Sequence, residues 1–177
     1  MSNAPEFVVN GERLRINELC PNTTLLEFLR SRGLTGAKEG CAEGDCGACT
    51  VIVREQAPGK TTWRAINSCI VPAALLAGRD IVTVEGIANR GGDLHCVQRA
   101  MVEHHGSQCG YCTPGFICSL FEAYHREDLN TSWQIDDQLC GNLCRCTGYW
   151  NIIEAVEAAA SAARDGASAD AAERDAR

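Results

Sequence analysis

The sequence predicts an α+β protein in which a small mixed-sheet domain, residues 1–89, precedes a compact helical domain, residues 90–163. Three observations lead to this prediction. Short apolar runs with a hairpin signal occupy the first half, apolar residues recur at helical spacing in the second, and the pattern changes after Gly91-Gly92. Residues 164–177 consist mainly of Ala, Asp and Arg with no apolar period, so we expect a disordered tail.

The first domain is predicted to begin with a β-hairpin and a capped helix. Asn10-Gly11 separates two short apolar runs and suits a type I′ turn, whose two central residues need positive φ. Thr24-Leu-Leu-Glu27 has the spacing of a capping box, so we expect a short helix to begin there and Gly33 to end it. Residues 49–53 and 81–84 are rich in β-branched side chains, which predicts two further strands.

The second domain is predicted to contain four helices. Residues 94–104 place apolar side chains near one side of a helix. Pro114 suits the first turn of the next helix, which we expect to extend to Tyr124. Shorter patterns predict a third helix within 135–139 and a fourth over 152–162. Four helices of this kind predict a bundle.

Composition narrows the class of partner. The chain has 177 residues, 45% of them hydrophobic, and a formal net charge of -7. Nucleic acids and anionic lipids favour surfaces rich in Lys and Arg, so we expect neither as a main partner. We find no apolar run of about 20 residues that could span a membrane and no secretory signal, so we expect a cytoplasmic protein.

Cysteine is the unusual component of the sequence, with twelve residues. In a reducing compartment, clustered cysteines more often bind metal or carry out redox chemistry than form disulfides. Most of them fall into three groups, at 41–49, 109–112 and 140–146, and this clustering favours metal.

The first group has the spacing C-x4-C-x2-C, formed by Cys41, Cys46 and Cys49. With one distant cysteine, this spacing is a known ligand set of a [2Fe-2S] cluster. Glycines between the thiols allow backbone N–H groups to approach the cluster sulfurs. Cys69 is the best candidate for the fourth ligand because it follows an apparent strand in the same half, and Cys20 is the alternative. Three metal-free thiols in one loop would be an oxidation liability, so that reading is disfavoured.

The second group has two interpretations. Cys109-Gly-Tyr-Cys112 could be a redox dithiol, but a thioredoxin-like site needs a preceding strand, and helical patterns lie on both sides here. Together with Cys140, Cys144 and Cys146, the pair could instead hold Zn²⁺ or a second iron–sulfur cluster. Spacing alone does not choose between Cys140/Cys144 and Cys144/Cys146 as the other half of the site.

Longer motifs carry a family resemblance. The segments are "KEGCAEGDCGACTV", "INSC", "VTVEGI", "HGSQCGYCTPGF" and "GNLCRCTGYWNII", and together they span roughly residues 5–160. In this order they resemble the iron–sulfur subunit of the molybdenum hydroxylases, the family of xanthine dehydrogenase, aldehyde oxidase and carbon monoxide dehydrogenase. The motifs "EGDCGAC", "AINSC" and "HGSQCG" look most similar to the xanthine dehydrogenase branch.

The resemblance implies a ferredoxin-like β-grasp domain followed by a four-helix bundle domain, each with one [2Fe-2S] cluster. It implies that the first cluster is held by Cys41, Cys46, Cys49 and Cys69. It implies that the second cluster is held by Cys109, Cys112, Cys144 and Cys146. Gln108 matches the glutamine beside the family's pterin, and Cys146 matches a ligand that also approaches it, so both are expected to be cofactor-binding residues.

The resemblance also implies an electron-transfer role without catalytic residues in this chain. Electrons would pass from a molybdenum–pterin cofactor on a large subunit through the two clusters to FAD on a medium subunit, and xanthine or hypoxanthine oxidation is the expected reaction. We expect flavin on another polypeptide because the chain ends in its Ala/Asp/Arg tail. The alternatives are an aldehyde, N-heterocycle or carbon monoxide oxidising complex, a zinc-binding adaptor, or a free ferredoxin-like carrier.

Four cysteines have no ligand role in this interpretation. Cys96 stands where relatives commonly have Pro, and Cys140 occupies a position that is usually apolar. We expect Cys96 and Cys140, together with Cys20 and Cys118, to be small buried hydrophobic residues.

Overall fold

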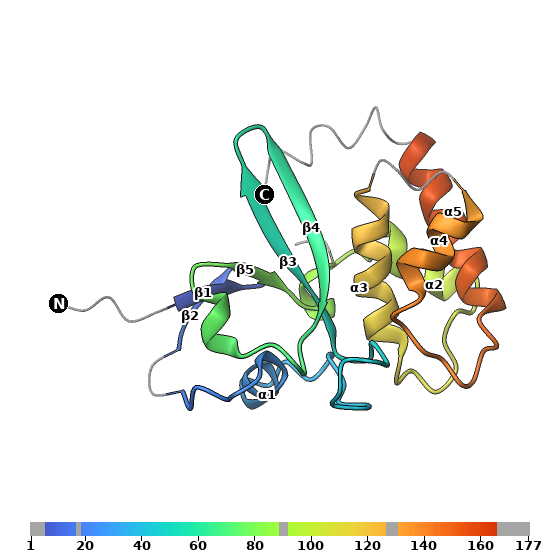
Figure 1. The fold of residues 1–177 in the computed structure, drawn as a ribbon. Helices are drawn as coiled ribbons and strands as arrows, with labels where there is room; N and C mark the ends of the chain where they lie inside the picture. Colours follow the sequence, from blue (N-terminus) through green and yellow to red (C-terminus); the bar gives the residue numbers. More distant parts are fainter. Residues whose placement is uncertain (1–5, 17–18, 89–91, 127–130, 166–177) are drawn as a thin grey trace.

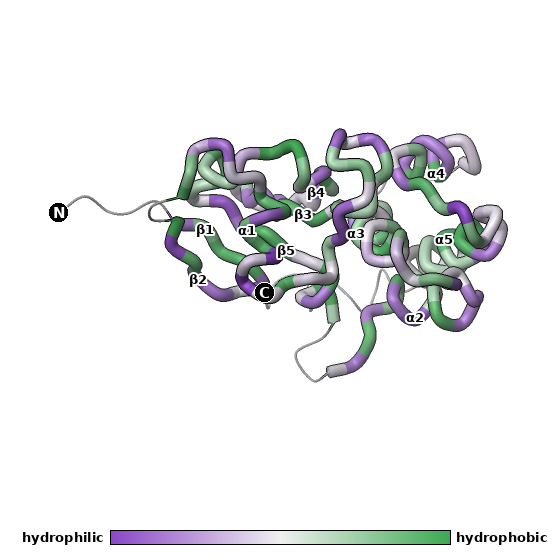
Figure 2. The backbone as a smooth tube through the Cα atoms, turned by 90° about the horizontal axis from the view of Figure 1, so that it is seen from below, coloured by the Kyte–Doolittle hydropathy of each residue, from purple (hydrophilic) through white to green (hydrophobic). Residues whose placement is uncertain are grey.

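The computed structural model describes residues 6–16, 19–88, 92–126 and 131–165. A sheet and one helix form the first half, and four helices lie beside them in the second half (Figure 1). The view from below shows the same side-by-side arrangement (Figure 2). The predicted α+β class is therefore confirmed.

The sheet has five strands in the order β2-β1-β5-β3-β4. Their bounds are Glu6–Val9 for β1, Glu12–Arg15 for β2, Thr50–Ala57 for β3, Lys60–Asn67 for β4 and Asp80–Val82 for β5. The β1–β5 pair is parallel and the other neighbouring pairs are antiparallel. The sheet is therefore mixed, as predicted.

The predicted hairpin and first helix are both present. Asn10 and Gly11 have φ values of 52° and 85°, and both lie in the turn between β1 and β2. Helix α1, Leu25–Ser31, begins with a capping box in which the Thr24 hydroxyl accepts from the Glu27 N–H. Gly33 follows the helix with a φ of 83°. Local sequence chemistry therefore set these boundaries.

Two strands differ from their predicted extents. Strand β3 is longer than the predicted 49–53 because it pairs with β4 along its whole length, from Thr50 opposite Asn67 to Ala57 opposite Lys60. The exposed end of this hairpin is polar, and an apolar pattern does not reveal it. Strand β5 ends at Val82, since a 3₁₀ turn, η2, begins at Val84.

The helices of the second half are α2 (Cys96–Glu103), α3 (Thr113–Tyr124), α4 (Ser132–Leu139) and α5 (Trp150–Asp165). Pro114 lies in the first turn of α3, as predicted. Helix α4 begins three residues before the predicted range because Thr131 and Gln134 form a capping box. The predicted boundary at 89/90 lies outside the described residues, as do residues 166–177 of the predicted tail.

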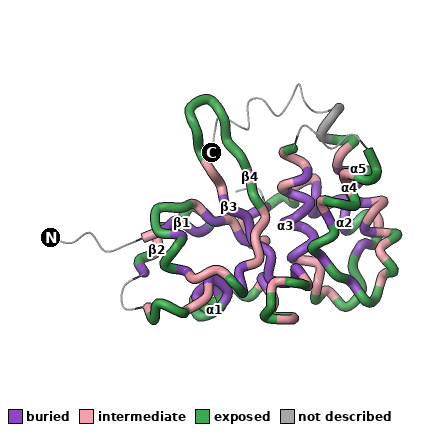
Figure 3. Tube along the Cα trace, viewed as in Figure 1, coloured by how far each residue is buried: buried purple, intermediate pink, exposed green. Residues whose placement is uncertain are grey.

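Strand β3 contributes to two cores. Val51 and Val53 pack with α1 in the core of the first half. Ile52, which points to the opposite face, packs with α3 in the core of the helical half. Figure 3 shows buried residues along α3 and exposed residues at the far end of the β3–β4 hairpin. No helix among the described residues is long and apolar enough to cross a membrane.

Candidate metal centres

The first candidate centre lies in the loop between α1 and β3. Backbone N–H groups point at its thiols: Cys41 N–H donates to Cys46 Sγ at 3.3 Å, and the N–H groups of Glu43 and Cys46 each donate to Cys41 Sγ at 3.4 Å. A loop wrapped in this way stabilises negative charge on sulfur, as an iron–sulfur cluster requires.

Glycine makes this tight loop possible. A Cβ atom at Gly40 would lie 2.7 Å from Cys46 Sγ, so a side chain there would displace the thiol. Gly44 has a φ of 86°, a conformation that residues with a Cβ rarely adopt. The glycine-rich sequence around the thiols is therefore a requirement of the loop geometry.

Cys69 joins this loop from the end of β4. Burial, followed by a hydrogen bond to Cys49, raises the pKa of the Cys69 thiol to about 11. In contrast, N–H donation from Glu43 and then Cys46 lowers the pKa of Cys41 to about 6. Cys69 therefore takes part in the described contacts among the thiols of the first centre. The exposed Cys20 takes part in none of these described contacts.

The second candidate centre lies where the loops before α3 and α5 meet. The pKa of the Cys109 thiol is lowered, mainly because the Tyr111 N–H donates to it and also because the Cys146 thiol donates to it. Burial, and then donation to Cys144, raises the pKa of Cys112 to about 12. At Cys144 burial acts to raise the pKa, but hydrogen bonds from Thr147 and others lower it overall.

Each centre therefore consists of two pairs of cysteines. The pairs are Cys41 with Cys46, Cys49 with Cys69, Cys109 with Cys146, and Cys112 with Cys144. Among the described residues, no three His, Cys, Asp or Glu side chains gather as a set that could hold a metal ion. Paired thiols fit a cluster with two irons, in which two protein ligands serve each iron.

The loops of the two centres touch each other. Leu143 N–H donates to the carbonyl of Cys46 at 3.0 Å, and the buried Asn142 amide donates to the carbonyl of Gly47 at 3.2 Å. Ser119 on α3 donates to the Asn142 carbonyl oxygen at 2.6 Å and fixes its orientation. Sequence reasoning missed Asn142, although its place in "CGNLC" between cysteines was the available signal.

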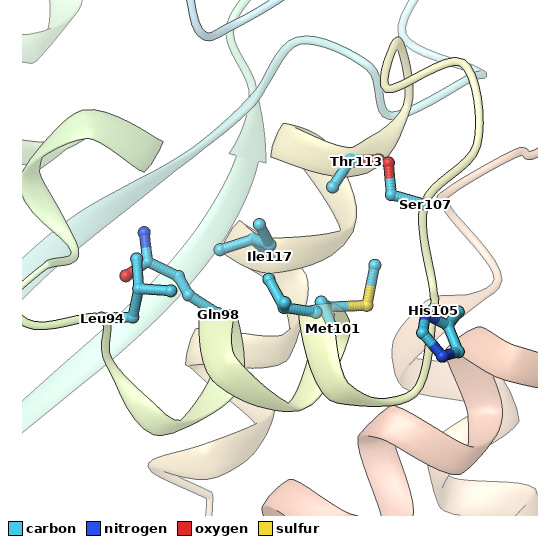
Figure 4. Close-up of a pocket in the computed structure, with 8 residues that line it drawn as sticks. Leu94, Gln98, Met101, His105, Ser107, Thr113 and Ile117 are labelled. Carbon is cyan, nitrogen blue, oxygen red and sulfur yellow. Dashed lines mark hydrogen bonds between the residues drawn. The ribbon is translucent and has the colours of Figure 1, made fainter.

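One side of the second centre is open. Gln108, Cys109 and Cys146 are exposed, in contrast to the buried Cys144. Beside them, between α2 and α3, is a hollow of about 380 Å³, shown in Figure 4. It is lined by Leu94, Gln98, Met101, Val102, His105, Ser107, Thr113 and Ile117. This side of the second centre is therefore accessible from outside the chain.

The four cysteines outside the two centres differ in burial. Cys118 is fully buried and burial raises the pKa of its thiol, so the prediction of a buried hydrophobic residue is confirmed there. Cys96 is half-buried. The prediction is wrong for Cys20 and Cys140, which are exposed. Cys140 follows α4 directly as its C-cap, and this position turns it outward instead of into the core.

Known families match both halves. Residues 7–74 match the family described as "2Fe-2S iron-sulfur cluster binding domain", and residues 83–157 match "[2Fe-2S] binding domain". Xanthine dehydrogenase from Oryza sativa subsp. japonica is 49% identical over 150 residues, which are 83% of this chain and 11% of that protein. The chain thus spans about a ninth of the length of this curated relative.

Two solved structures are similar over nearly the whole chain. Quinoline 2-oxidoreductase from Pseudomonas putida 86 matches with a TM-score of 0.75 and 33% identity, covering 92% of this chain and 96% of the matched chain. Aldehyde oxidoreductase from Desulfovibrio desulfuricans ATCC 27774 matches with a TM-score of 0.78 and 36% identity, covering 91% of this chain and 17% of the other.

Proposed function

The chain belongs to the iron–sulfur part of the molybdenum hydroxylase family, and we propose that it relays electrons between a molybdenum–pterin site and FAD on partner subunits. When bound, each [2Fe-2S] cluster accepts and releases one electron at a time. The chain's own task is to hold the clusters, tune them and bring them near each other.

We propose the eight paired cysteines as the ligands. Cys41, Cys46, Cys49 and Cys69 hold one cluster, and Cys109, Cys112, Cys144 and Cys146 hold the other. We interpret the sheet half as a ferredoxin-like β-grasp domain and α2–α5 as its four-helix companion. The paired contacts and the N–H groups directed at sulfur support this assignment.

The relay rests on one observation, the hydrogen bond between the two loops. The Leu143 N–H donates to the Cys46 carbonyl. Leu143 is the neighbour of the proposed ligand Cys144, and Cys46 is a proposed ligand of the other cluster. A short chain of bonds therefore links one ligand set to the other. A zinc adaptor or a free carrier with one cluster has no use for such a link.

The extent of the matches to relatives supports the proposed partners. The quinoline 2-oxidoreductase chain matches this chain almost end to end, which supports a separate iron–sulfur subunit with molybdenum and flavin subunits as partners. The match to 11% of the rice xanthine dehydrogenase is consistent with the same unit occurring within a longer protein. The identity of 49% to that enzyme favours purine oxidation over aldehyde, N-heterocycle or carbon monoxide oxidation.

Iron and sulfide analysis tests the cluster content. The purified full chain should be reddish-brown, contain about four iron and about four sulfide per chain, and show two [2Fe-2S] EPR signals after reduction. A colourless protein that contains zinc would contradict the proposal. One signal with half the iron would instead support a single-cluster carrier.

Gln108 provides a test of the molybdenum-facing side. It is exposed beside Cys109, whose partner Cys146 is exposed as well, so this edge is accessible to a cofactor on another subunit. In the assembled complex, Gln108→Ala should leave iron content intact but slow xanthine-driven bleaching of the cluster absorbance, measured by anaerobic stopped flow. Bleaching by dithionite should keep its rate, because that reductant bypasses the pterin.

Gln56→Ala is the matched control, since Gln56 is exposed on the β3–β4 hairpin, away from both centres. It should leave both rates unchanged. If Gln108→Ala also leaves both rates unchanged, Gln108 has no part in the electron path. Oxidation of xanthine by the isolated chain would refute the relay itself.

A further inference from the structure

A ring of hydrogen bonds surrounds one thiol of the second centre. The Thr147 hydroxyl donates to Cys144 Sγ at 3.2 Å, and the Thr147 N–H approaches the same sulfur at 3.5 Å. Tyr149 N–H donates to the Thr147 hydroxyl at 3.1 Å, and Cys144 N–H donates to the Tyr149 hydroxyl at 2.9 Å. Three residues thus close a ring on a buried sulfur.

The ring fixes the direction of the Thr147 proton. A hydroxyl group has one proton to donate, and its oxygen can accept at the same time. Because the Thr147 oxygen accepts from Tyr149 N–H, its proton remains available for donation, and Cys144 Sγ at 3.2 Å is the acceptor described for it. Hydroxyl rotation, which would otherwise weaken the contact, is restricted.

The backbone is held in an unusual conformation to make this contact. Gly148 and Tyr149 both have positive φ, 65° and 70°, and for Tyr149 this conformation is strained. The Tyr149 ring packs edge-on against Phe116 of α3, with ring centroids 6.3 Å apart, and thereby anchors the turn. The first centre differs, since the donors described to Cys41 Sγ and Cys46 Sγ include backbone N–H groups but no side-chain hydroxyl.

We infer that Thr147 is a tuning residue that raises the reduction potential of the second cluster by donating its hydroxyl proton to the ligand sulfur of Cys144. Reduction adds negative charge to a cluster, and a hydrogen bond to a ligand sulfur stabilises that charge. The inference rests on the proposed ligation of a cluster by Cys144. The donor keeps its effect only where water does not compete, and burial of Cys144 meets this condition.

The test is an EPR-monitored redox titration of the full chain with both clusters. Thr147→Val removes the hydroxyl with little change of shape and should shift the midpoint potential of one signal to a more negative value. The potential of the other signal should stay the same. Thr147→Ser retains a hydroxyl, so its potentials should stay close to those of the unmodified chain.

The outcomes separate this inference from the proposed function. If the unmodified chain lacks a second [2Fe-2S] signal, the proposed function fails. If both signals are present but Thr147→Val leaves both potentials unchanged, or Thr147→Ser shifts them as far, the tuning role is overturned. Thr147→Ala is the second variant if Thr147→Val loses iron. Loss of iron in both, with retention in Thr147→Ser, would overturn tuning and assign the hydroxyl to assembly of the site.

Discussion

Cys46→Ser should remove or distort one [2Fe-2S] EPR signal, reduce bound iron by about half, and leave the other signal recognisable. Cys46 belongs to the first candidate centre, and its pairing partner is Cys41. The contact between the two centres uses the backbone carbonyl of Cys46 and not its thiol, so the substitution leaves that contact in place. EPR and iron analysis of the reduced full chain measure both effects.

Cys140→Ala is the matched control for the loss of a thiol. Cys140 is exposed and lies next to the second centre without joining its described contacts, so iron content and both signals should be retained. Loss of both signals from folded Cys46→Ser would show that the clusters are not independently housed. If Cys140→Ala empties the second site and Cys144→Ala does not, the ligand assignment is wrong.

Gly115→Ala should lower the stability of the whole chain strongly. Gly115 lies in the first turn of α3, and a Cβ atom there would lie 2.0 Å from the carbonyl oxygen of Gly47 in the first loop. Both groups belong to the backbone, so helix and loop would have to separate. The cost should reach the upper end of the range for overpacking, about 3 kcal/mol. For a chain of this size, that cost lowers the unfolding midpoint by about 10 °C.

Gly141→Ala is the matched control for this substitution. Gly141 is in the neighbouring loop, and a Cβ atom there would meet nothing within 4 Å. Its stability should stay within about 0.5 kcal/mol of the unmodified chain. Thermal unfolding followed by circular dichroism measures both variants. Equal midpoints for Gly115→Ala and Gly141→Ala would mean that the two halves do not approach as closely as the structure has them.

Sequence predicted the elements whose boundaries depend on local chemistry. Asn10-Gly11 needs positive φ, and Thr24 with Glu27 satisfies the first N–H groups of α1, so neither depends on distant residues. Thr131 and Gln134 form the same kind of cap, and this pair in the sequence marks the observed start of α4. His95 with Gln98 caps α2 in the same way, but His is a less common cap and its position gave little signal.

The parts that the sequence did not predict depend on tertiary contact. The strand order places β5 between β1 and β3, and no local pattern specifies it. The spacing of the cysteines left the other half of the second site open between Cys140/Cys144 and Cys144/Cys146, and only the family resemblance favoured the latter pair. The approach of Gly47 to Gly115, and the role of Asn142 between them, arise only when the two halves meet.

The position of Ile52 has a consequence for the order in which the protein is made and folds. Strand β3 buries Val51 on one side against α1 and Ile52 on the other against the helical half. The N–H of Ala65, on the edge strand β4, is covered by the Glu122 carboxylate of α3 at 3.0 Å. During synthesis these groups emerge before the helices that cover them. The nascent sheet therefore presents an apolar face and an open edge until α3 leaves the ribosome, and this interval is when the chain is most vulnerable to aggregation.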